Sequence, residues 1–385
     1  MVVGEEGAMA RRISQLAVGV TGPRGFIAGH LSRRLAANPL VRMIACPRAT
    51  FTDSAALRAF ANECDVIVHL AGMNRGSQRE VYDTNLSLVD RLIEALAGCE
   101  HPPHIIFASS TQRDQPGEYG RSKRDGEERL RDWARRSNGR LTTLIIPNVF
   151  GPGCRPFYNS VVATFCHQLA HGQQPIVIDD QQIEFVWIND LVETICQVVR
   201  QPGQGLAERR VAGSARLAVS EMLAKLSVFR RSYFDENVVP DLSDPLDASL
   251  YTTFLSYVDL DDHCHRPRVH RDDRGQLFEI LRMAGGGQIF FSTTKPGVIR
   301  GNHFHTRKIE WFCVLRGEAA IRIRRVGYDH VREFRVSGDS PQFISIPALH
   351  THQIENIGTE ELLTMFWCNE IFQPADPDTF FENVA

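Results

Sequence analysis

The chain has 385 residues, of which 43% are hydrophobic, and a formal net charge of -3. A chain of this length is too long for one ordinary hydrophobic core and has enough apolar residues to build two, so two domains are expected. The small net charge gives no electrostatic case for a nucleic-acid partner or an anionic membrane surface. Nine cysteines at irregular spacing, without a Cys-x-x-Cys pair, indicate a reducing compartment and no disulfide framework.

The sequence carries no evident targeting or membrane signal. Residues 1–14 lack the apolar stretch of a signal peptide, and nothing later approaches the roughly 18 consecutive apolar residues of a membrane span. We therefore expect a cytoplasmic protein with a frayed N-terminus.

Strand and helix patterns alternate through the first half of the chain. Residues 15–20 form an apolar strand candidate that runs into a glycine turn, after which Leu31 and Leu35 recur at helical spacing. This alternation predicts a Rossmann-like, doubly wound parallel sheet of the α/β class. Further strand candidates are 41–48, 65–72, 105–111 and 141–146, with helical patterns at 89–96 and 127–134.

The pattern changes near Gly275 to short alternating strands broken by glycine and proline, which is typical of an all-β barrel or sandwich. The stretch between Pro240 and Pro267 is rich in proline and aspartate and is the expected join. We predict a first domain over 15–250 and a second over 265–385. The strand candidates of the second domain are 288–292, 319–326, 342–346 and 362–367.

The glycine turn predicts a dinucleotide site. In Gly22-x-x-Gly25-x-x-Ala28 the backbone can approach a diphosphate, whose charge is met by the amides and dipole at the helix start. The second strand candidate lacks the acidic residue that binds the ribose of NAD. Arg48 stands there and Arg24 lies in the turn, which favours the 2'-phosphate of NADPH; the alternative is that either arginine is simply exposed.

Tyr119 and Lys123 in Tyr119-Gly-Arg-Ser-Lys123 are one helical turn apart and can face one ligand. An ammonium near the phenol lowers the pKa of the phenol, which can then pass a proton to a carbonyl being reduced. A hydroxyl at the end of strand 105–111 would donate to the same oxygen. This pattern indicates hydride transfer at a ketone.

A different chemistry is predicted for the second half. His303 and His305 project to the same face of a strand, while Glu310 and His352 are placed to close the site from neighbouring strands. Three imidazoles and one carboxylate suit Zn, Fe, Mn or Ni, and zinc is our expectation. The alternative is a relic cage that binds nothing.

An acid-base residue near the cage is also predicted. His350, two residues before His352, and Lys295 are the candidates for acid-base catalysis. The competing interpretation is that His350 is structural and Lys295 is exposed. The metal itself could polarise a ketone, stabilise an enediolate or simply hold the barrel together.

The motifs of the first half together resemble the extended short-chain dehydrogenase/reductases that act on nucleotide sugars. They are Thr-Gly-x-x-Gly-Phe-Ile, Asp-Val-Ile-Val-His-Leu-Ala-Gly, the Ser-Ser strand end, Tyr-Gly-x-Ser-Lys and Pro147-Asn-Val-Phe-Gly-Pro152. The resemblance implies Ser110, with Thr111 as its alternate, Tyr119 and Lys123 as the catalytic triad. It departs at Ala28, in place of a third glycine, and at Ile145, where the family often has arginine. The implied cofactor-binding residues are Thr21, Gly22, Arg24, Gly25, Phe26, Ile27, Arg48, Leu70, Ala71, Gly72, Asn85, Tyr119 and Lys123.

The second half matches the two motifs of the cupin barrel, except that Leu349 replaces a usual glycine. The order of the halves and several shared runs resemble the CapF family of bifunctional capsular polysaccharide enzymes, from about residue 16 onward. These runs are 148–160 with 161–166, 250–256, 273–275, 295–303 and 336–339.

The CapF resemblance implies C3 epimerisation of a UDP-4-keto-6-deoxy-N-acetylhexosamine in the cupin domain, followed by C4 reduction with NADPH. The implied product is a UDP-6-deoxy-L-talosamine derivative, a precursor of UDP-N-acetyl-L-fucosamine. Family members tend to have tyrosine where this chain has His350, so the epimerase acid and base stay open. Candidate substrate contacts are Asn74, Arg75, Asn148, Arg155 and Asn159.

Two other functions compete with the bifunctional enzyme. One is an NADPH-dependent sugar-nucleotide reductase with a purely structural cupin. The other is a sugar-nucleotide sensor on an inactive scaffold, against which the intact Ser110, Tyr119 and Lys123 argue. The expected partners are a UDP-sugar substrate and, because a barrel sheet would be exposed, a second copy of the chain in a homodimer.

Overall fold

The computed structural model describes residues 15–201, 203–236, 238–266, 269–272, 275–278, 282–284, 288–370 and 375–385. The expected frayed N-terminus, and Asp273 and Arg274 of one CapF-like run, lie outside the described residues.

The chain forms two compact units. One contains the residues up to Pro147 together with Asp190–Val211, and the other contains Asn148–Asn189 with the residues from Ala212 onward. The chain therefore crosses between the units several times. Because the second unit includes residues of both predicted domains, the domain limits 15–250 and 265–385 stay a prediction.

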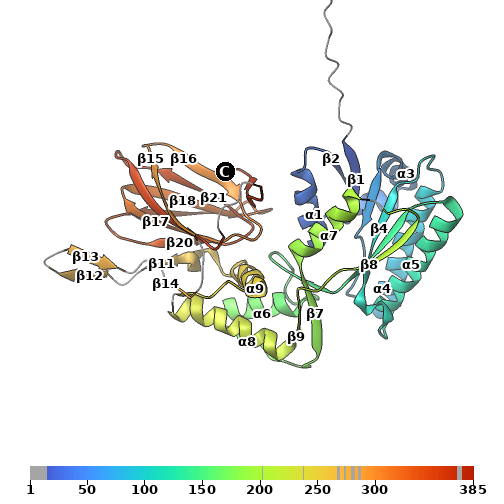
Figure 1. Cartoon of the computed structure of the whole chain (residues 1–385), viewed down its shortest axis with the longest axis horizontal. Helices are drawn as coiled ribbons and strands as arrows, with labels where there is room; N and C mark the ends of the chain where they lie inside the picture. The colour runs from blue at the N-terminus through green and yellow to red at the C-terminus, as the bar shows by residue number, and fades with distance from the viewer. Residues whose placement is uncertain are drawn as a thin grey trace, which may run out of the picture. The chain divides into compact units, whose positions relative to one another are not determined.

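The first unit is built on a six-stranded sheet in the order β2-β1-β3-β4-β5-β8, and every neighbouring pair is parallel (Figure 1). The inner strands are buried apolar runs because helices cover both faces of a doubly wound sheet. This confirms the predicted parallel Rossmann-like sheet. The strands are β1 (Leu16–Thr21), β2 (Val41–Cys46), β3 (Val66–His69), β4 (His104–Ser110), β5 (Leu141–Ile146) and β8 (Leu206–Arg210).

Helices α3, α4 and α5 share one hydrophobic core with the sheet, and Figure 1 shows α1 and α7 on the other side of it. Helix α4 begins at a capping box in which Ser77 and Glu80 satisfy each other's backbone amides. The helices are α1 (Phe26–Ala36), α2 (Arg48–Thr52), α3 (Ser54–Glu63), α4 (Gln78–Leu96), η1 (Thr111–Asp114), α5 (Glu118–Ser137) and α7 (Ile188–Arg200).

In its described residues, the second unit begins with a small sheet, three α-helices and two short helical segments of other types. Strand β6 pairs in parallel with β7, which pairs antiparallel with β9. These elements are β6 (Asn148–Phe150), α6 (Val161–Ala170), β7 (Gln182–Trp187), β9 (Ala215–Ala218), α8 (Val219–Arg230), η2 (Arg231–Glu236), β10 (Val238–Val239), α9 (Pro245–Leu255) and η3 (Leu260–His263).

The rest of the second unit is all β, as predicted. Two five-stranded antiparallel sheets, β11-β20-β17-β22-β15 and β19-β18-β21-β16-β23, form the barrel drawn in orange and red in Figure 1. The strands from here on are β11 (Cys264–His265), β12 (Val269–Asp272), β13 (Gly275–Phe278), β14 (Arg282–Met283), β15 (Gln288–Thr294), β16 (Ile299–Phe304), β17 (Glu310–Arg316), β18 (Glu318–Arg325), β19 (Val331–Ser337), β20 (Phe343–Ile346), β21 (His350–Asn356), β22 (Leu362–Cys368) and β23 (Phe380–Phe381).

One hydrophobic core runs through the second unit. Buried residues of α6, α8 and α9 form a single cluster with Trp311, Phe343 and Trp367 on the barrel strands β17, β20 and β22. The barrel encloses a second cluster between its own sheets, with Phe312 and Ile354 among its members. Among the helices in the described parts of the chain, none is long and apolar enough to cross a lipid bilayer.

Candidate functional site

The glycine turn lies where β1 and β2 end side by side. The Gly22 amide donates to the carbonyl of Cys46 at 3.2 Å. At φ +64° Gly22 is in the left-handed region, and a Cβ there would lie 3.1 Å from Cα of Ala71. No side chain caps α1 at Gly25, so the first amides of this helix are open to an anion. The turn therefore has the close backbone approach and the free donors that a diphosphate needs.

Thr21, at the end of β1, holds the loop that follows β3. Its buried Oγ1 accepts hydrogen bonds from the amides of Leu70 and Ala71, at 3.0 and 2.9 Å, and lies 3.1 Å from Nδ1 of His69. Burial lowers the pKa of His69 to about 3, so the ring is neutral and accepts the Thr21 hydroxyl proton at Nδ1. Residues 70–72 are thus held beside the glycine turn.

Arg24 and Arg48, the two predicted determinants of NADPH, are both exposed. Arg24 lies within the turn, and Arg48 follows the end of β2 by two residues. Neither guanidinium makes a hydrogen bond or an ion pair within the described ranges. Both are therefore available to a ligand phosphate.

Ser110, Tyr119 and Lys123 come together at the end of β4 and the start of α5. Tyr119 is half-buried; burial raises the pKa of its phenol, and a hydrogen bond with Ser110 opposes that rise. The Lys123 Nζ atom lies 5.8 Å from the centre of the Tyr119 ring and donates to the carbonyl of Ala108 at 2.8 Å. Burial lowers the pKa of Lys123 to about 8. In the protein alone, burial therefore outweighs the lowering of the phenol pKa that the sequence suggested.

Asn85 ties three segments of this site together. Its side chain accepts from the Met73 amide at 2.6 Å and donates to the Met73 carbonyl at 2.8 Å and to Ser122 Oγ at 2.9 Å. The Ser122 hydroxyl in turn donates to the carbonyl of Tyr119. Asn85 thus positions the backbone of Tyr119 through Ser122, a route that the sequence pattern did not reveal.

Sequence reasoning also missed the role of Gly120. A Cβ at this position would lie 2.1 Å from the carbonyl oxygen of Gln112 in η1. Only glycine lets α5 pack this closely against the turn that follows Ser110. The glycine within Tyr-Gly-Arg-Ser-Lys was the available signal.

The predicted substrate residues are divided between the two units. Asn74 and Arg75 lie in the loop after β3, in the first unit. Asn148 begins β6, and the exposed Arg155 and Asn159 follow it in the second unit. The Arg155 guanidinium lies over the Tyr158 ring, 5.4 Å from its centre.

The four predicted metal ligands converge in the barrel. His303, His305, Glu310 and His352 each offer a ligand atom, and these atoms all lie within 4.8 Å of one another. His303 and His352 are directly opposite on β16 and β21, next to a β-bulge at Asn302. Bulges re-aim a side chain, and this bulge sets His303 across from His352.

The donors and acceptors of the cage suit a cation. Nδ1 of His305 donates to the carbonyl of Asp378 at 2.6 Å, and Nδ1 of His352 donates to the carbonyl of His350 at 3.2 Å. The Nε2 lone pairs of these two rings therefore face Oε2 of Glu310, at 3.3 and 3.1 Å. All three atoms are buried without a hydrogen-bond partner. Acceptors that face one another in this way fit a divalent metal ion.

The pKa values of the cage residues are shifted by burial and by their neighbours. Burial acts against the charge of Glu310, yet His305 and His352 hold the pKa of Glu310 well below its usual range. Burial also opposes a charge on His305, and Glu310 raises its pKa above the ordinary value. Burial lowers the pKa of His303 to about 4. Without a metal, the ionised carboxylate of Glu310 thus favours a proton on His305. A divalent cation would take the place of that proton, because a histidine binds a metal through its neutral imidazole.

The two predicted bases occupy different environments. His350 is buried at the start of β21, and its Nδ1 donates to the carbonyl of Ala348 at 2.9 Å, which leaves Nε2 as the acceptor. Leu349, just before it, has a φ of +59°, so the left-handed turn is kept without the usual glycine. Lys295 is exposed in the turn before β16, at the end of that strand opposite His303. The structure does not bring Lys295 to the cage.

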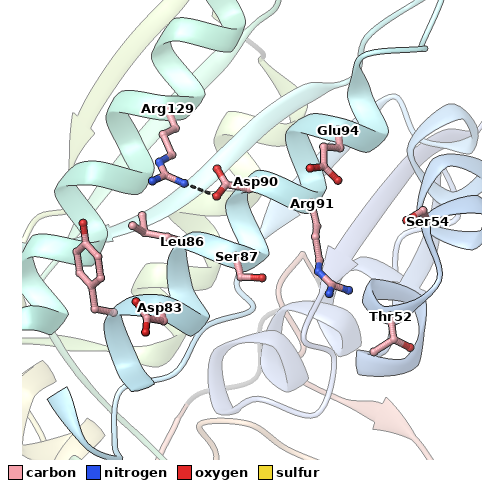
Figure 2. A pocket seen from close by; sticks show the side chains of 10 residues that line it. Thr52, Ser54, Asp83, Leu86, Ser87, Asp90, Arg91, Glu94 and Arg129 are labelled. Atoms are coloured by element: carbon pink, nitrogen blue, oxygen red, sulfur yellow. Dashed lines mark hydrogen bonds and ion pairs between the residues drawn. The ribbon is translucent and has the colours of Figure 1, made fainter. Parts of the chain in front are cut away.

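A polar groove of about 660 Å³ on the first unit contains none of the predicted site residues (Figure 2). Both of its arginines are engaged within the protein, since Arg129 pairs with Asp90 and Arg91 donates to the carbonyl of Phe51 (Figure 2 draws the Arg129–Asp90 pair). We assign no ligand to it. The groove is lined by Thr52, Ser54, Tyr82, Asp83, Leu86, Ser87, Asp90, Arg91, Glu94 and Arg129.

Comparison with known proteins identifies both halves. Residues 18–212 match the NAD dependent epimerase/dehydratase family, and residues 270–380 match the polysaccharide biosynthesis C-terminal domain. A curated relative, UDP-2-acetamido-2,6-beta-L-arabino-hexul-4-ose reductase from Pseudomonas aeruginosa, is 32% identical over 364 residues, which cover 94% of this chain and 97% of the relative. The crystal structure of the capsular polysaccharide assembling protein CapF from Staphylococcus aureus is 33% identical, with a TM-score of 0.63, over 95% of this chain and 100% of that one. The chain belongs to the CapF family.

Membership of the CapF family accounts for the order of the two halves. A more distant structure, the Bordetella bronchiseptica enzyme WbmF in complex with NADH, is 16% identical with a TM-score of 0.50 and covers 57% of this chain and 78% of that one. At that identity the likeness shows the fold of the reductase half alone. The CapF-like fold therefore extends across both halves, over 95% of the chain, and the Rossmann-like half is shared more widely.

Proposed function

We propose that this protein is a bifunctional nucleotide-sugar enzyme of capsule or O-antigen synthesis. Its barrel would epimerise C3 of a UDP-4-keto-6-deoxy-N-acetylhexosamine, and its Rossmann-like half would reduce the C4 ketone with NADPH. The supporting observation is that one chain holds both the Ser110, Tyr119 and Lys123 cluster and a cage of three imidazoles and one carboxylate. The Pseudomonas relative is named for reduction of a hexul-4-ose, a sugar with its ketone at C4.

Reduction would use the residues at the start of α5. A bound NADPH supplies the hydride that becomes the new C4–H bond. Tyr119 gives its phenolic proton to the carbonyl oxygen, and Ser110, hydrogen-bonded to Tyr119, holds that oxygen in place. Protonated Lys123 beside the ring stabilises the phenolate that remains until a proton from water restores the phenol.

Cofactor binding would rest on the glycine turn. The diphosphate is assigned to the open amides at the start of α1, against the close approach of Gly22 to Ala71. Arg24 and Arg48 are assigned to the 2'-phosphate. Of the remaining predicted cofactor contacts, Phe26 and Ile27 open α1, and Leu70 and Gly72 lie in the loop after β3.

Epimerisation would occur in the barrel. The C4 ketone makes the C3 proton acidic, so a base can remove that proton and an acid can return one to the opposite face, while the electron pair rests on the C4 oxygen as an enolate. We assign the base to His350. Its Nδ1 donates to the carbonyl of Ala348, so the lone pair that can accept a proton is on Nε2. The divalent cation that His303, His305, Glu310 and His352 would hold supplies positive charge for the developing oxyanion. Lys295 has the weaker geometric case.

The order of the two steps follows from the ketone. Reduction converts C4 to an alcohol, after which the C3 proton is no longer acidic. Epimerisation must therefore come first, and reduction traps its product. Zinc as the metal, a homodimer and a cytoplasmic location stay predictions from the sequence.

The test is to incubate the purified protein with the UDP-4-keto-6-deoxy sugar in deuterated water and follow it by NMR, with and without NADPH. We expect deuterium at C3 without cofactor, and a reduced, C3-inverted sugar with it. Tyr119→Phe should keep the exchange and lose the reduction, while Glu310→Gln should lose the exchange. Reduction without any exchange would instead favour a reductase with a purely structural cupin. The absence of both reactions would show that this sugar is not the substrate.

A further inference from the structure

We propose that Asp378 is a positioning residue for the metal cage, and that it acts by orienting His305 and the loop that leads to Glu310. This inference rests on the proposed metal centre. Asp378 lies in the last segment of the chain, 375–385, some 70 residues from the ligands that it would position. It is buried and adopts a φ of +42°.

The backbone carbonyl of Asp378 determines which nitrogen of His305 faces the cage. It accepts the Nδ1–H of His305 at 2.6 Å, so the lone pair of that ring lies on Nε2, toward Glu310. A partner of this kind fixes both the tautomer and the ring orientation of a metal-binding histidine.

The carboxylate of Asp378 holds the loop that follows His305. Its oxygens accept the amides of three successive residues, Thr306, Arg307 and Lys308, at 3.0 to 3.2 Å, and the Thr306 hydroxyl at 2.6 Å. Three consecutive amides that converge on one anion form a concave binding site for it. Without that anion, the amides of this partly buried loop would lose their partners.

This loop links two cage residues. His305 lies one residue beyond β16, outside the regular strand, and Glu310 opens β17 five residues later. Beyond the strand, the carbonyl of His305 accepts the Leu349 amide at 2.8 Å, which holds its backbone. The contacts with Asp378 hold its ring and the loop that follows.

The same segment also reaches the other side of the cage. The Glu382 amide donates to the carbonyl of Asn302 at 2.9 Å, and the Val384 amide donates to Oδ1 of Asn302 at 3.3 Å. Asn302 is the bulged residue next to His303. Arg324 secures the segment by donating to the carbonyls of Asn383 and Val384. Segment 375–385 thus supports both His303 and His305.

The test compares Asp378→Asn with the unmodified chain. Asparagine tolerates the left-handed backbone of this position and keeps the carbonyl that binds His305, but its amide cannot replace a carboxylate that accepts four donors. Asp376→Asn is the matched control, because Asp376 belongs to the same segment and is an exposed residue that pairs with Arg307. Each full-length protein would be stripped of metal with a chelator and titrated with zinc against a chromophoric competitor.

We expect Asp378→Asn to weaken zinc binding about 10- to 100-fold, and Asp376→Asn to change it less than about threefold. Cobalt(II) loading provides a second measurement, since its visible absorption reports ligand number and geometry. The spectrum should change in Asp378→Asn and stay unaltered in the control. Thr306→Val removes the 2.6 Å hydroxyl contact with Asp378 and the 3.3 Å contact that Asn189 makes with the same hydroxyl. It keeps the carboxylate, so it should weaken zinc binding by a smaller factor, and it provides a second test if Asp378→Asn misfolds.

Unchanged zinc affinity and an unchanged cobalt spectrum in Asp378→Asn, even with a lower melting temperature, would reduce Asp378 to a structural role and overturn the inference. Failure of the unmodified chain to bind zinc or cobalt would overturn the proposed metal centre itself, and this inference with it. The two failures are distinguished by the unmodified protein alone.

Discussion

Lys123 donates a hydrogen bond from Nζ to the carbonyl oxygen of Ala108, 2.8 Å away, in a position almost closed to solvent. Burial lowers the pKa of Lys123 from 10.5 to about 8. Between these two values the unfolded chain binds the proton more tightly than the folded protein does. The free energy of unfolding therefore rises with pH across this window, and the full penalty of burying the charge is present below pH 8.

Lys123→Met should accordingly stabilise the protein at pH 7 while it abolishes reduction. Removing the buried charge is worth at most about 3 kcal/mol, and the lost hydrogen bond offsets about 1 kcal/mol, so we expect the free energy of unfolding to rise by about 2 kcal/mol. Urea unfolding at pH 7 and at pH 10 provides the measurement, and the gain should shrink at the higher pH. A loss of stability at pH 7 would contradict this account of Lys123.

Arg48→Ala should reduce the preference of the reductase for NADPH. Loss of a charge-assisted hydrogen bond to the 2'-phosphate should raise the KM for NADPH about 10- to 100-fold and leave the KM for NADH nearly unchanged. Arg24→Ala should act in the same direction. Steady-state kinetics with each cofactor provide the measurement. An equal change of KM for NADPH and for NADH would show that these arginines do not bind the 2'-phosphate.

Gly120→Ala should destabilise the first unit and slow the reduction. The added methyl would overlap the carbonyl of Gln112, so η1 or α5 must shift, at a cost of about 2 to 3 kcal/mol. The matched control is Gly29→Ala in α1, where the nearest atom is the end of the Arg33 side chain at 3.9 Å. That change should stabilise the helix by up to about 1 kcal/mol. Thermal melting and kcat for both variants test the contrast.

Metal removal should destabilise the barrel. Zinc at a hundred times its dissociation constant should add about 2.7 kcal/mol to the free energy of unfolding, and a chelator should remove it. Glu310→Gln should lose this response, whereas Glu318→Gln, an exposed glutamate on β18, should keep it. Melting curves with zinc and with chelator give the answer. A chelator response that survives in Glu310→Gln would place the metal elsewhere.

The central strands of the first unit could be predicted because a doubly wound sheet buries them on both faces. Strands β1 to β5 coincide closely with the apolar runs of the sequence. Helix α5 begins at Glu118, nine residues before the pattern at 127–134, because its first turns hold polar residues of the site. The three-residue strand β6 gave no periodic signal.

The four cage residues could be found by spacing, but their supports could not. His303 and His305 were expected to share one strand face, whereas β16 is bulged at Asn302 and ends at Phe304. Asp378 lies in an Asp-Pro-Asp-Thr sequence that reads as an ordinary turn. The positioning role of Asp378 depends on contacts between residues about 70 positions apart, and local sequence patterns give no information about such contacts.

The core of the second unit bears on how this enzyme can be divided. Tyr251 and Phe254 of α9 belong to the same buried cluster as Trp311 and Trp367 of the barrel. The sequence composition suggests a boundary between residues 250 and 265. Dividing the chain there would expose buried aromatic side chains on both fragments. Neither fragment would be a ready-made module for exchange with another enzyme. The boundary between the two proposed activities therefore does not coincide with a boundary in folding.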